Sequence, residues 1–362
     1  MTTDDAILDT PLTEPCDPEE FIRAAMRWHF SPDTGSRFWL DRLPRLDFDP
    51  LRDVTTPEDL ALFPNLCAEL RDAPVADLIP RGYTNPRVAG VFESSGTTGA
   101  PKRVVVLEDW CEQAQGFSNA TLDEHGVPRG VNWLILLPTG PHLAGTMLPR
   151  TAASRGGMAF TVDMDPRWVK KLIADGRPDE AAAYTRHVLD QARHVLRTQD
   201  VGVLAISPPM LERLAEDEEL VDLVRAKVTA IQWGGAHMDP DTWHLLRTEV
   251  FPGVILVGSL GNTMILGGTR LRATDGPQCV FDPPSPFTTF RVVDPATGER
   301  VPYGARGRVV MNHVSRNFLL PNNLERDEAT RVPGVPGQVG DSVADVSPVA
   351  AFEGEAVIEG VY

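Results

Sequence analysis

The segment with the clearest chemical potential is a run of nine residues in which hydroxyl groups and glycines precede a lysine. The run follows the apolar stretch Val88 to Phe92 and consists of Ser94, Ser95, Gly96, Thr97, Thr98, Gly99, Ala100, Pro101 and Lys102. Glycines let backbone N–H groups approach a polyphosphate, hydroxyl groups donate to its oxygens, and a lysine supplies a mobile positive charge. The sequence therefore predicts a phosphate-binding loop and nucleotide chemistry.

This loop differs from the Walker A loop of GTPases and related enzymes. A Walker A loop needs a second glycine five positions after the first, then lysine, then serine or threonine. Counting from Gly96 gives Pro101, Lys102 and Arg103, so both the second glycine and the magnesium-binding hydroxyl are missing. The loop is therefore not that of a GTPase-like protein. The alternative to a phosphate-binding loop is a polar surface loop without function.

The run resembles the signature loop of adenylate-forming enzymes, which is usually written T-S-G-T-T-G-x-P-K. Only the first position differs, because Ser94 stands where the family has threonine. The family includes acyl-CoA synthetases, aryl-acid adenylating enzymes, adenylation domains and luciferases. The resemblance implies that the chain uses ATP and Mg²⁺ and that Lys102 holds the departing pyrophosphate.

Further segments resemble motifs of the same family and occur in the family's order between about residues 85 and 345. The resemblance places His142 in the wall of the acid pocket and Thr263 against the α-phosphate. It assigns nucleotide binding to Gly234, Gly235, Ala236, Gly261, Asn262 and Asp341. Each motif alone has a simpler explanation, since a loop histidine, a Gly-Gly turn and a Gly-Asp turn are common.

Two positions depart from the family's pattern. Leu260 stands where the family has the aromatic residue that stacks on adenine, and Met264 stands where it has the carboxylate that holds Mg²⁺. A thioether is a poor ligand for a hard cation that prefers oxygen. Three alternatives follow: phosphates and waters hold the metal, a displaced acid serves, or the site has lost activity.

The elements that must position these loops are short apolar runs separated by helical patterns. Helical spacing occurs over residues 19–30, 56–62, 179–198 and 209–227. The apolar runs are 88–92, 104–107, 133–137, 159–162, 203–206, 230–233 and 254–257. Such alternation predicts an α/β fold with parallel sheets and helices on their faces.

From about Gly267 the pattern changes to short strands and turns, which predicts an antiparallel, barrel-like part. The expected organisation is a flexible acidic N-terminus (1–18), helical and α/β subdomains that bind nucleotide and acyl group (19–266), and a β-rich subdomain (267–362). The family resemblance implies the large N-terminal domain, with two αβα parallel-rich sheets and a distorted β-barrel. It also implies that the small C-terminal domain, which carries the family's catalytic lysine, is absent.

Composition excludes several classes of function. The 362 residues carry a formal charge of −17, so electrostatics disfavour binding to nucleic acid. We expect no membrane segment, because no window approaches eighteen consecutive apolar residues, and a cytoplasmic location, because no secretory leader is evident. The four cysteines are scattered without zinc-ligand spacing, so they are expected to be reduced thiols.

The resemblance is greatest to the phenylacetate-CoA ligase branch and to short aryl-acid adenylating proteins of phenazine pathways. It implies conversion of a small aromatic carboxylic acid to aryl-AMP and pyrophosphate in secondary metabolism, such as antibiotic biosynthesis. The product would pass to an aldehyde-dehydrogenase-like reductase or another acyl acceptor. Two alternatives remain open: a full acid-CoA or acid-amine ligase, and a catalytically degenerate protein that binds nucleotide or aryl acid.

Overall fold

The computed structural model describes residues 3–94, 100–273, 278–349, 351–352 and 355–356. Its central element is a five-stranded parallel sheet with the strand order β4-β3-β5-β6-β7. The strands are β3 (Trp133–Leu136), β4 (Ala159–Thr161), β5 (Val203–Ile206), β6 (Ala230–Gly234) and β7 (Ile255–Ser259). All five correspond to apolar runs identified in the sequence, so the predicted parallel sheet is confirmed.

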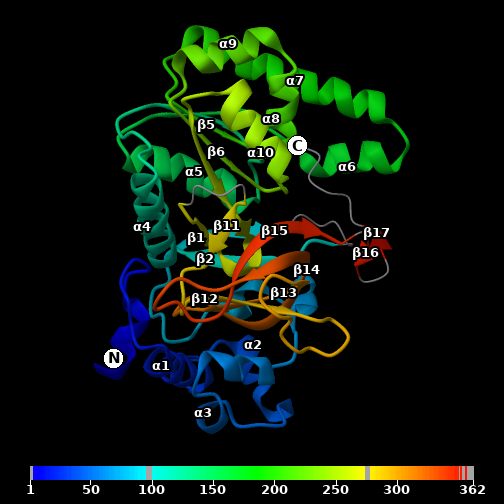
Figure 1. Cartoon of the computed structure of the whole chain (residues 1–362). Coiled ribbons are helices and arrows are strands. Elements are labelled where there is room, and N and C mark those ends of the chain that lie inside the picture. Colours follow the sequence, from blue (N-terminus) through cyan, green and yellow to red (C-terminus); the bar gives the residue numbers. More distant parts are fainter. Residues whose placement is uncertain (1–2, 95–99, 274–277, 350, 353–354, 357–362) are drawn as a thin grey trace.

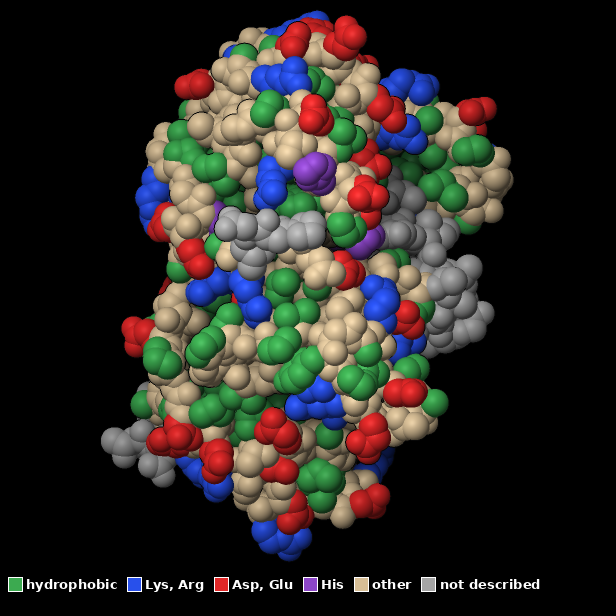
Figure 2. All heavy atoms as spheres, in the orientation of Figure 1, with side chains coloured by type: hydrophobic (Ala, Val, Ile, Leu, Met, Phe, Trp, Pro, Cys, Tyr) green, Lys and Arg blue, Asp and Glu red, His purple; other side chains and the backbone are tan. Residues whose placement is uncertain are grey.

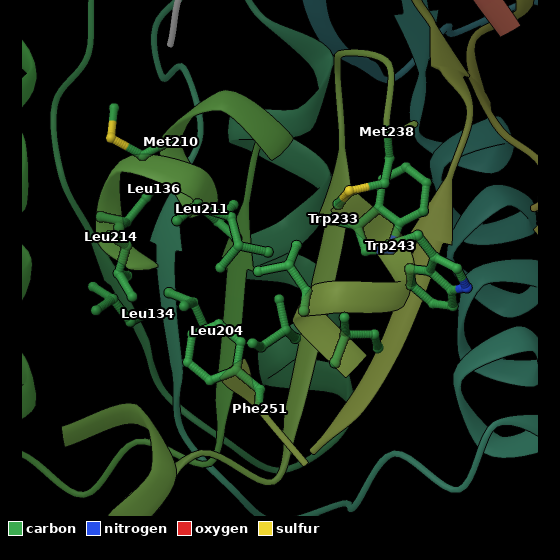
Figure 3. Close-up of a cluster of buried hydrophobic side chains, with 14 of the residues drawn as sticks. Leu134, Leu136, Leu204, Met210, Leu211, Leu214, Trp233, Met238, Trp243 and Phe251 are labelled. Carbon is green, nitrogen blue, oxygen red and sulfur yellow. The ribbon is translucent and has the colours of Figure 1, made fainter. Parts of the chain in front are cut away.

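Helices cover both faces of this sheet, because successive side chains of a strand point to opposite sides. Leu134 and Leu136 of β3 pack with side chains of α7 (Pro178–Thr198), α8 (Pro208–Ala215) and α9 (Glu218–Lys227). Figure 3 shows Leu134, Leu136 and Leu204 next to Met210, Leu211 and Leu214 of α8. Trp133 and Ile135 face the other side, where α4 (Glu108–Glu124) and α5 (Leu143–Ser154) contribute Leu122 and Leu148. Two short helices, α6 (Pro166–Ala174) and α10 (Pro240–Leu245), complete this part.

The first two apolar runs do not join a parallel sheet. They form β1 (Val88–Glu93) and β2 (Arg103–Leu107), which pair antiparallel, with Phe92 opposite Val104. The connection between them is too short for the crossover that parallel strands need, which takes a dozen residues or more. The described residues therefore contain one parallel sheet, and the phosphate loop connects the two strands of a hairpin.

A six-stranded antiparallel sheet follows in the sequence, with the strand order β10-β11-β15-β14-β13-β12. Its strands are β10 (Arg270–Leu271), β11 (Val280–Asp282), β12 (Thr288–Val293), β13 (Arg306–Val314), β14 (Leu319–Val332) and β15 (Ser342–Pro348). The sheet curls into a half-barrel, as the sequence predicted, and the short pair β16 (Ala351–Phe352) and β17 (Glu355–Ala356) follows it. One buried cluster contains Phe290 and Val343 of this sheet together with Ile231 of the parallel sheet.

The N-terminal region forms short helices at the end of the molecule opposite α9 (Figure 1). They are η1 (Thr3–Asp9), α1 (Pro18–Phe30), α2 (Arg37–Leu40), η2 (Leu43–Arg45), α3 (Pro50–Asp53), η3 (Pro57–Leu62), η4 (Cys67–Arg71) and η5 (Val75–Leu78). We expected residues 1–18 to be flexible. The structure instead buries Leu8 to 2% exposure, and Asp9 forms an ion pair with Arg316, because η1 has an apolar side to cover.

Figure 2 shows acidic and basic side chains dispersed over one face, without a continuous basic patch there. Among the described residues, no helix combines the length and apolar character needed to cross a bilayer.

Candidate active site

A cavity of about 410 Å³ lies at the carboxyl ends of β6 and β7. Open α/β sheets bind ligands at this edge, because the loops that follow the strands converge there. The loop after β6 contributes Gly234, Gly235 and Ala236, and the segment after β7 contributes Gly261, Asn262 and Thr263. Ser94, Lys102 and His142 also line the cavity, so the structure brings together nine predicted site residues that are distant in the sequence.

The two ends of the predicted phosphate loop are held to each other at the cavity. Ser94 N–H donates to the carbonyl of Lys102 at 2.9 Å, and the N–H of Lys102 donates to Ser94 Oγ at 3.0 Å. The predicted residues Ser95, Gly96, Thr97, Thr98 and Gly99 lie outside the described residues. The two hydrogen bonds between Ser94 and Lys102 close the base of the loop, and both residues line the cavity.

Cys67 lies beside Lys102 and is almost completely buried. Burial raises the pKa of its thiol to about 12, and Lys102 opposes this effect through its charge and a hydrogen bond. A thiol with such a pKa is unreactive at neutral pH, because the thiolate is the nucleophile. Cys67 therefore serves as a neutral neighbour of Lys102.

The backbone of Glu93 connects three parts of the site. Its N–H donates to the carbonyl of Pro141 at 2.8 Å, and its carbonyl accepts from Thr263 Oγ1 at 3.5 Å. Thr263 begins the turn η7 (Thr263–Ile265), where Asn262 Oδ1 accepts from Met264 N–H at 2.8 Å. Strand β1, the loop before His142 and the Gly-Asn-Thr segment are thereby fixed relative to one another.

The Glu93 side chain also lines the cavity and was missed by the sequence analysis. Its carboxylate accepts from Arg103 Nε at 2.9 Å and from Arg167 Nη2 at 2.6 Å. Burial raises the pKa of this carboxyl, but the hydrogen bonds from Arg167 and Arg103 outweigh that effect and hold the pKa below its usual value. Nothing in the sequence indicates this pairing, because Arg167 comes from α6, 74 positions away.

His142 is the N-cap residue of α5. Burial lowers the pKa of its imidazole, the positive charge of Arg167 acts in the same direction, and Glu93 opposes both. The neutral imidazole is therefore favoured at neutral pH. A neutral ring offers one donor and one acceptor nitrogen to a ligand.

The Gly-Gly-Ala turn fits closely against the neighbouring strand. A Cβ atom on Gly234 would lie 2.7 Å from the carbonyl oxygen of Ser259, and Gly235 has a φ of +84°. The first position has no space for a side chain, and the second has a backbone conformation that favours glycine. Both glycines thus have a structural reason to be present in addition to the predicted contact with adenine.

Another part of the wall is apolar and comes from α4 and α5. Trp110, Ala114 and Phe117 occupy one face of α4, and Leu143 and Met147 belong to α5. Trp110 Nε1 donates to the carbonyl of Leu266 at 2.8 Å, which fixes the indole ring. No sequence motif identified this wall, although the three α4 residues are spaced at four and three positions, as on a helix face.

Asp341 is not among the described residues that line the cavity. Its carboxylate accepts from Arg331 Nε at 2.8 Å and from Val292 N–H at 3.0 Å, inside the antiparallel sheet. Three other acids missed by the sequence analysis do line the cavity, namely Glu325, Asp327 and Asp345. Nine predicted residues therefore meet at the cavity, whereas Asp341 is paired within the antiparallel sheet.

The position at which the family resemblance implies a carboxylate for Mg²⁺ holds a thioether in this structure. Met264 is buried to 2% exposure at the position of the expected carboxylate, and Glu93 is already paired with two arginines. Among the described residues, no cluster of three or more histidine, cysteine or acidic side chains is arranged to hold a metal ion. Met264 therefore supplies no ligand for Mg²⁺, and the other acids that line the cavity are Glu325, Asp327 and Asp345.

The sequence pattern of the AMP-binding enzyme family matches residues 80–315. This chain belongs to that family, which is part of the adenylate-forming superfamily. The matched residues include β1, β2, the whole parallel sheet and nearly all of the predicted site residues. No curated protein sequence matches the chain.

Solved structures with a similar fold include an open conformation of 2-hydroxyisobutyryl-CoA ligase in complex with 2-HIB-AMP and CoA. The TM-score is 0.61 at 14% identity, covering 94% of this chain and 77% of that one. The same ligase in its postadenylation state gives 0.60 at 15% identity, covering 92% and 68%. ATP-bound MatB from Rhodopseudomonas palustris gives 0.46 at 19% identity, covering 71% of this chain and 47% of the MatB chain.

Proposed function

We propose that this protein joins ATP and a small aromatic carboxylic acid to form an acyl adenylate and pyrophosphate. The observation that carries the proposal is one cavity that combines a phosphate-loop base with an apolar wall. Ser94 and Lys102 offer a donor and a positive charge, whereas Trp110 and Phe117 offer an apolar surface. A nucleoside triphosphate needs the phosphate-loop base, and an aryl acid needs an adjacent apolar surface.

In the proposed reaction, a carboxylate oxygen of the acid attacks the α-phosphorus of ATP. A new C–O–P bond forms, the bond from the α-phosphorus to the β-bridging oxygen breaks, and pyrophosphate leaves with the bonding electrons. Such transfers depend mainly on positioning and on neutralising the departing charge. This chain has groups of the required types at the cavity.

We assign the following roles to the predicted residues. Lys102 and Ser94 hold the departing pyrophosphate, together with Ser95, Gly96, Thr97, Thr98 and Gly99. Thr263 contacts the α-phosphate, and the turn Gly234 to Ala236 lies against adenine. Neutral His142 borders the reacting carboxylate. Asp341 acts indirectly, by fixing the strand that leads to the cavity residue Asp345.

The aromatic substrate, the use in secondary metabolism and the hand-over to a reductase or other acyl acceptor are parts of the same proposal. The open-conformation ligase of similar fold was solved with an acyl adenylate and CoA, which supports an adenylate product in a cavity of this architecture. A reductase, an amine and a thiol are all chemically able to consume an acyl adenylate.

The test is acid-dependent exchange of labelled pyrophosphate into ATP, with benzoic, aminobenzoic, hydroxybenzoic and phenazine acids. We expect exchange with aryl acids and a loss of about 100-fold in Lys102→Ala, the size seen when a charge-stabilising group is removed. Lys171→Ala is the matched control, because Lys171 is exposed and pairs with Asp175 on α6. Equal exchange in Lys102→Ala and Lys171→Ala would refute the assignment of Lys102.

A second function is favoured by the position of Met264. Because a thioether replaces the expected carboxylate, the chain would act as a nucleotide- or acid-binding protein without catalysis. Equilibrium binding of ATP together with no exchange for any acid distinguishes this function from adenylation. Met264→Glu would then be expected to gain exchange activity if loss of the carboxylate were the cause.

A further inference from the structure

Leu12 lines the cavity although it belongs to the N-terminal segment, 82 positions before Ser94. It is 9% exposed and belongs to the same buried cluster as Trp110, Phe117 and Leu143. Ala114 and Met147 pack against that cluster. Leu12 therefore adds a third apolar side to the wall formed by α4 and α5.

The segment that carries Leu12 is held in place by two sets of hydrogen bonds. The N–H of Leu12 donates to Gln113 Oε1 at 3.2 Å, and Gln113 Nε2 donates to the carbonyl of Asp9 at 3.4 Å. Arg316 binds the Asp9 carboxylate at 2.6 and 2.9 Å and the carbonyl of Asp5 at 2.6 Å. Gln113 lies on α4 next to Ala114, so the segment is attached directly to the apolar wall. Figure 1 shows the N-terminal segment passing the foot of α4.

The described side chains that α4 and α5 contribute to the cavity are all uncharged. Charged groups of the cavity, such as Lys102, Glu93 and Asp327, come from other elements. A second charge on a substrate would lose its hydration at the α4–α5 wall without gaining a partner, which is costly. This part of the cavity therefore suits a hydrocarbon or aromatic group.

We propose that Leu12 closes the acid-binding part of the cavity and sets the length of the acid. The substrate class is a monocarboxylic acid whose apolar, ring-sized remainder ends against Leu12 and carries no second charge. This inference deepens the proposed function and rests on it for the identity of the bound acid. Leu12 is thereby a specificity-determining residue on a segment outside the matched family region, residues 80–315.

The experiment is calorimetric titration of the full chain, with a non-hydrolysable ATP analogue present, against benzoate and its 4-methyl, 4-propyl and 4-pentyl derivatives. We expect Leu12→Ala to improve binding of the longer acids relative to benzoate by about tenfold or more, and Leu12→Phe to shift the preference the other way. Leu8→Ala is the matched control, because Leu8 is a buried leucine of the same segment that is not among the described cavity residues. 4-Carboxybenzoate should bind at least tenfold more weakly than 4-methylbenzoate.

The same length profile in Leu12→Ala, Leu12→Phe and Leu8→Ala would overturn the inference, as would absence of binding of every acid to every variant. Pyrophosphate exchange by the unchanged protein decides the proposed function separately. A shifted length profile without exchange would support the role of Leu12 and refute adenylation.

Discussion

Arg331 of β14 and Asp341, the residue before β15, form a buried ion pair. Arg331 Nε donates to Asp341 Oδ1 at 2.8 Å, and the two side chains are 11% and 1% exposed. The Asp341 N–H also donates to the carbonyl of Phe290. A carboxylate with these partners holds β14, β12 and the start of the β15 segment together, and Asp341 is not among the described residues that line the cavity.

The ion pair predicts that Asp341→Ala mainly reduces stability. Removing one partner leaves the Arg331 charge buried without compensation, which typically costs about 3–5 kcal/mol. Arg331→Met combined with Asp341→Ala should recover much of this loss, since neither charge then remains. Urea unfolding of both variants measures the effect. A stable Asp341→Ala variant that no longer binds ATP would instead support a direct role in nucleotide binding.

Two buried histidines, His29 and His313, predict a loss of stability in acid. Burial lowers the pKa of His29 to about 4 and that of His313 to about 3, and the ring of His29 contributes to the second effect. In the unfolded chain both titrate near pH 6.5. Unfolding therefore takes up protons below pH 6.5. Above pH 6.5 the free energy of unfolding keeps the full contribution of both neutral histidines. It decreases as the pH falls towards 4 for His29 and 3 for His313, by about 1.4 kcal/mol per pH unit for each.

Urea unfolding at pH 7, 6 and 5 checks this dependence. His29→Gln should have a shallower dependence than the unchanged protein, because one titrating group is removed. His244→Gln is the control, since His244 is exposed on α10. A His29→Gln variant with the original pH slope would show that other groups cause the acid sensitivity.

The parallel sheet was predictable because its strands are short apolar runs, of which β3 and β5 are completely buried while the edge strand β4 is only partly buried. The apolar pattern did not indicate that β1 and β2 pair antiparallel. The loop between Glu93 and Arg103 is too short for a parallel connection, and it therefore determines the direction of the pair. The helical pattern over 209–227 became two helices, because Asp217 caps α9 by accepting from Leu220 N–H. Local periodicity therefore indicates an element more reliably than its pairing or its boundaries.

The site was predictable where it depends on backbone motifs and was missed where it depends on tertiary contacts. Gly234 and Thr263 belong to short motifs with recognisable spacing. Glu93 is held by arginines from β2 and α6, and Leu12 reaches the cavity from the N-terminal segment. No local sequence signal joins such residues. Asp341 differs from these residues, because the structure shows its pairing with Arg331, which the Gly-Asp motif did not indicate.

Gly116 and Gly145 predict opposite effects of alanine substitution. Gly116 is exposed in the middle of α4, and no atom lies within 4 Å of an added Cβ. Gly116→Ala should stabilise the protein by about 0.5–1 kcal/mol, because glycine is a poor helix former. At Gly145 in α5, an added Cβ would lie 2.7 Å from the carbonyl oxygen of Pro138. Gly145→Ala should therefore lower the melting temperature, and a rise in both variants would contradict the described packing of α5 against the loop before it.

The ion pair between Asp9 and Arg316 predicts that the N-terminal segment can be loosened without unfolding the rest of the chain. Arg316 is 9% exposed at its side chain and also lies over the Trp28 ring at 4.4 Å, so it keeps contacts when Asp9 is changed. Asp9→Ala should accelerate hydrogen exchange at the Leu12 N–H, which donates to Gln113, while amides of β5 remain protected. Hydrogen-exchange mass spectrometry resolves the two regions. The control is Glu14→Ala, which removes a nearby acid that does not pair with Arg316. If Asp9→Ala leaves the exchange of Leu12 unchanged, the Gln113 contacts alone hold the segment that closes the cavity.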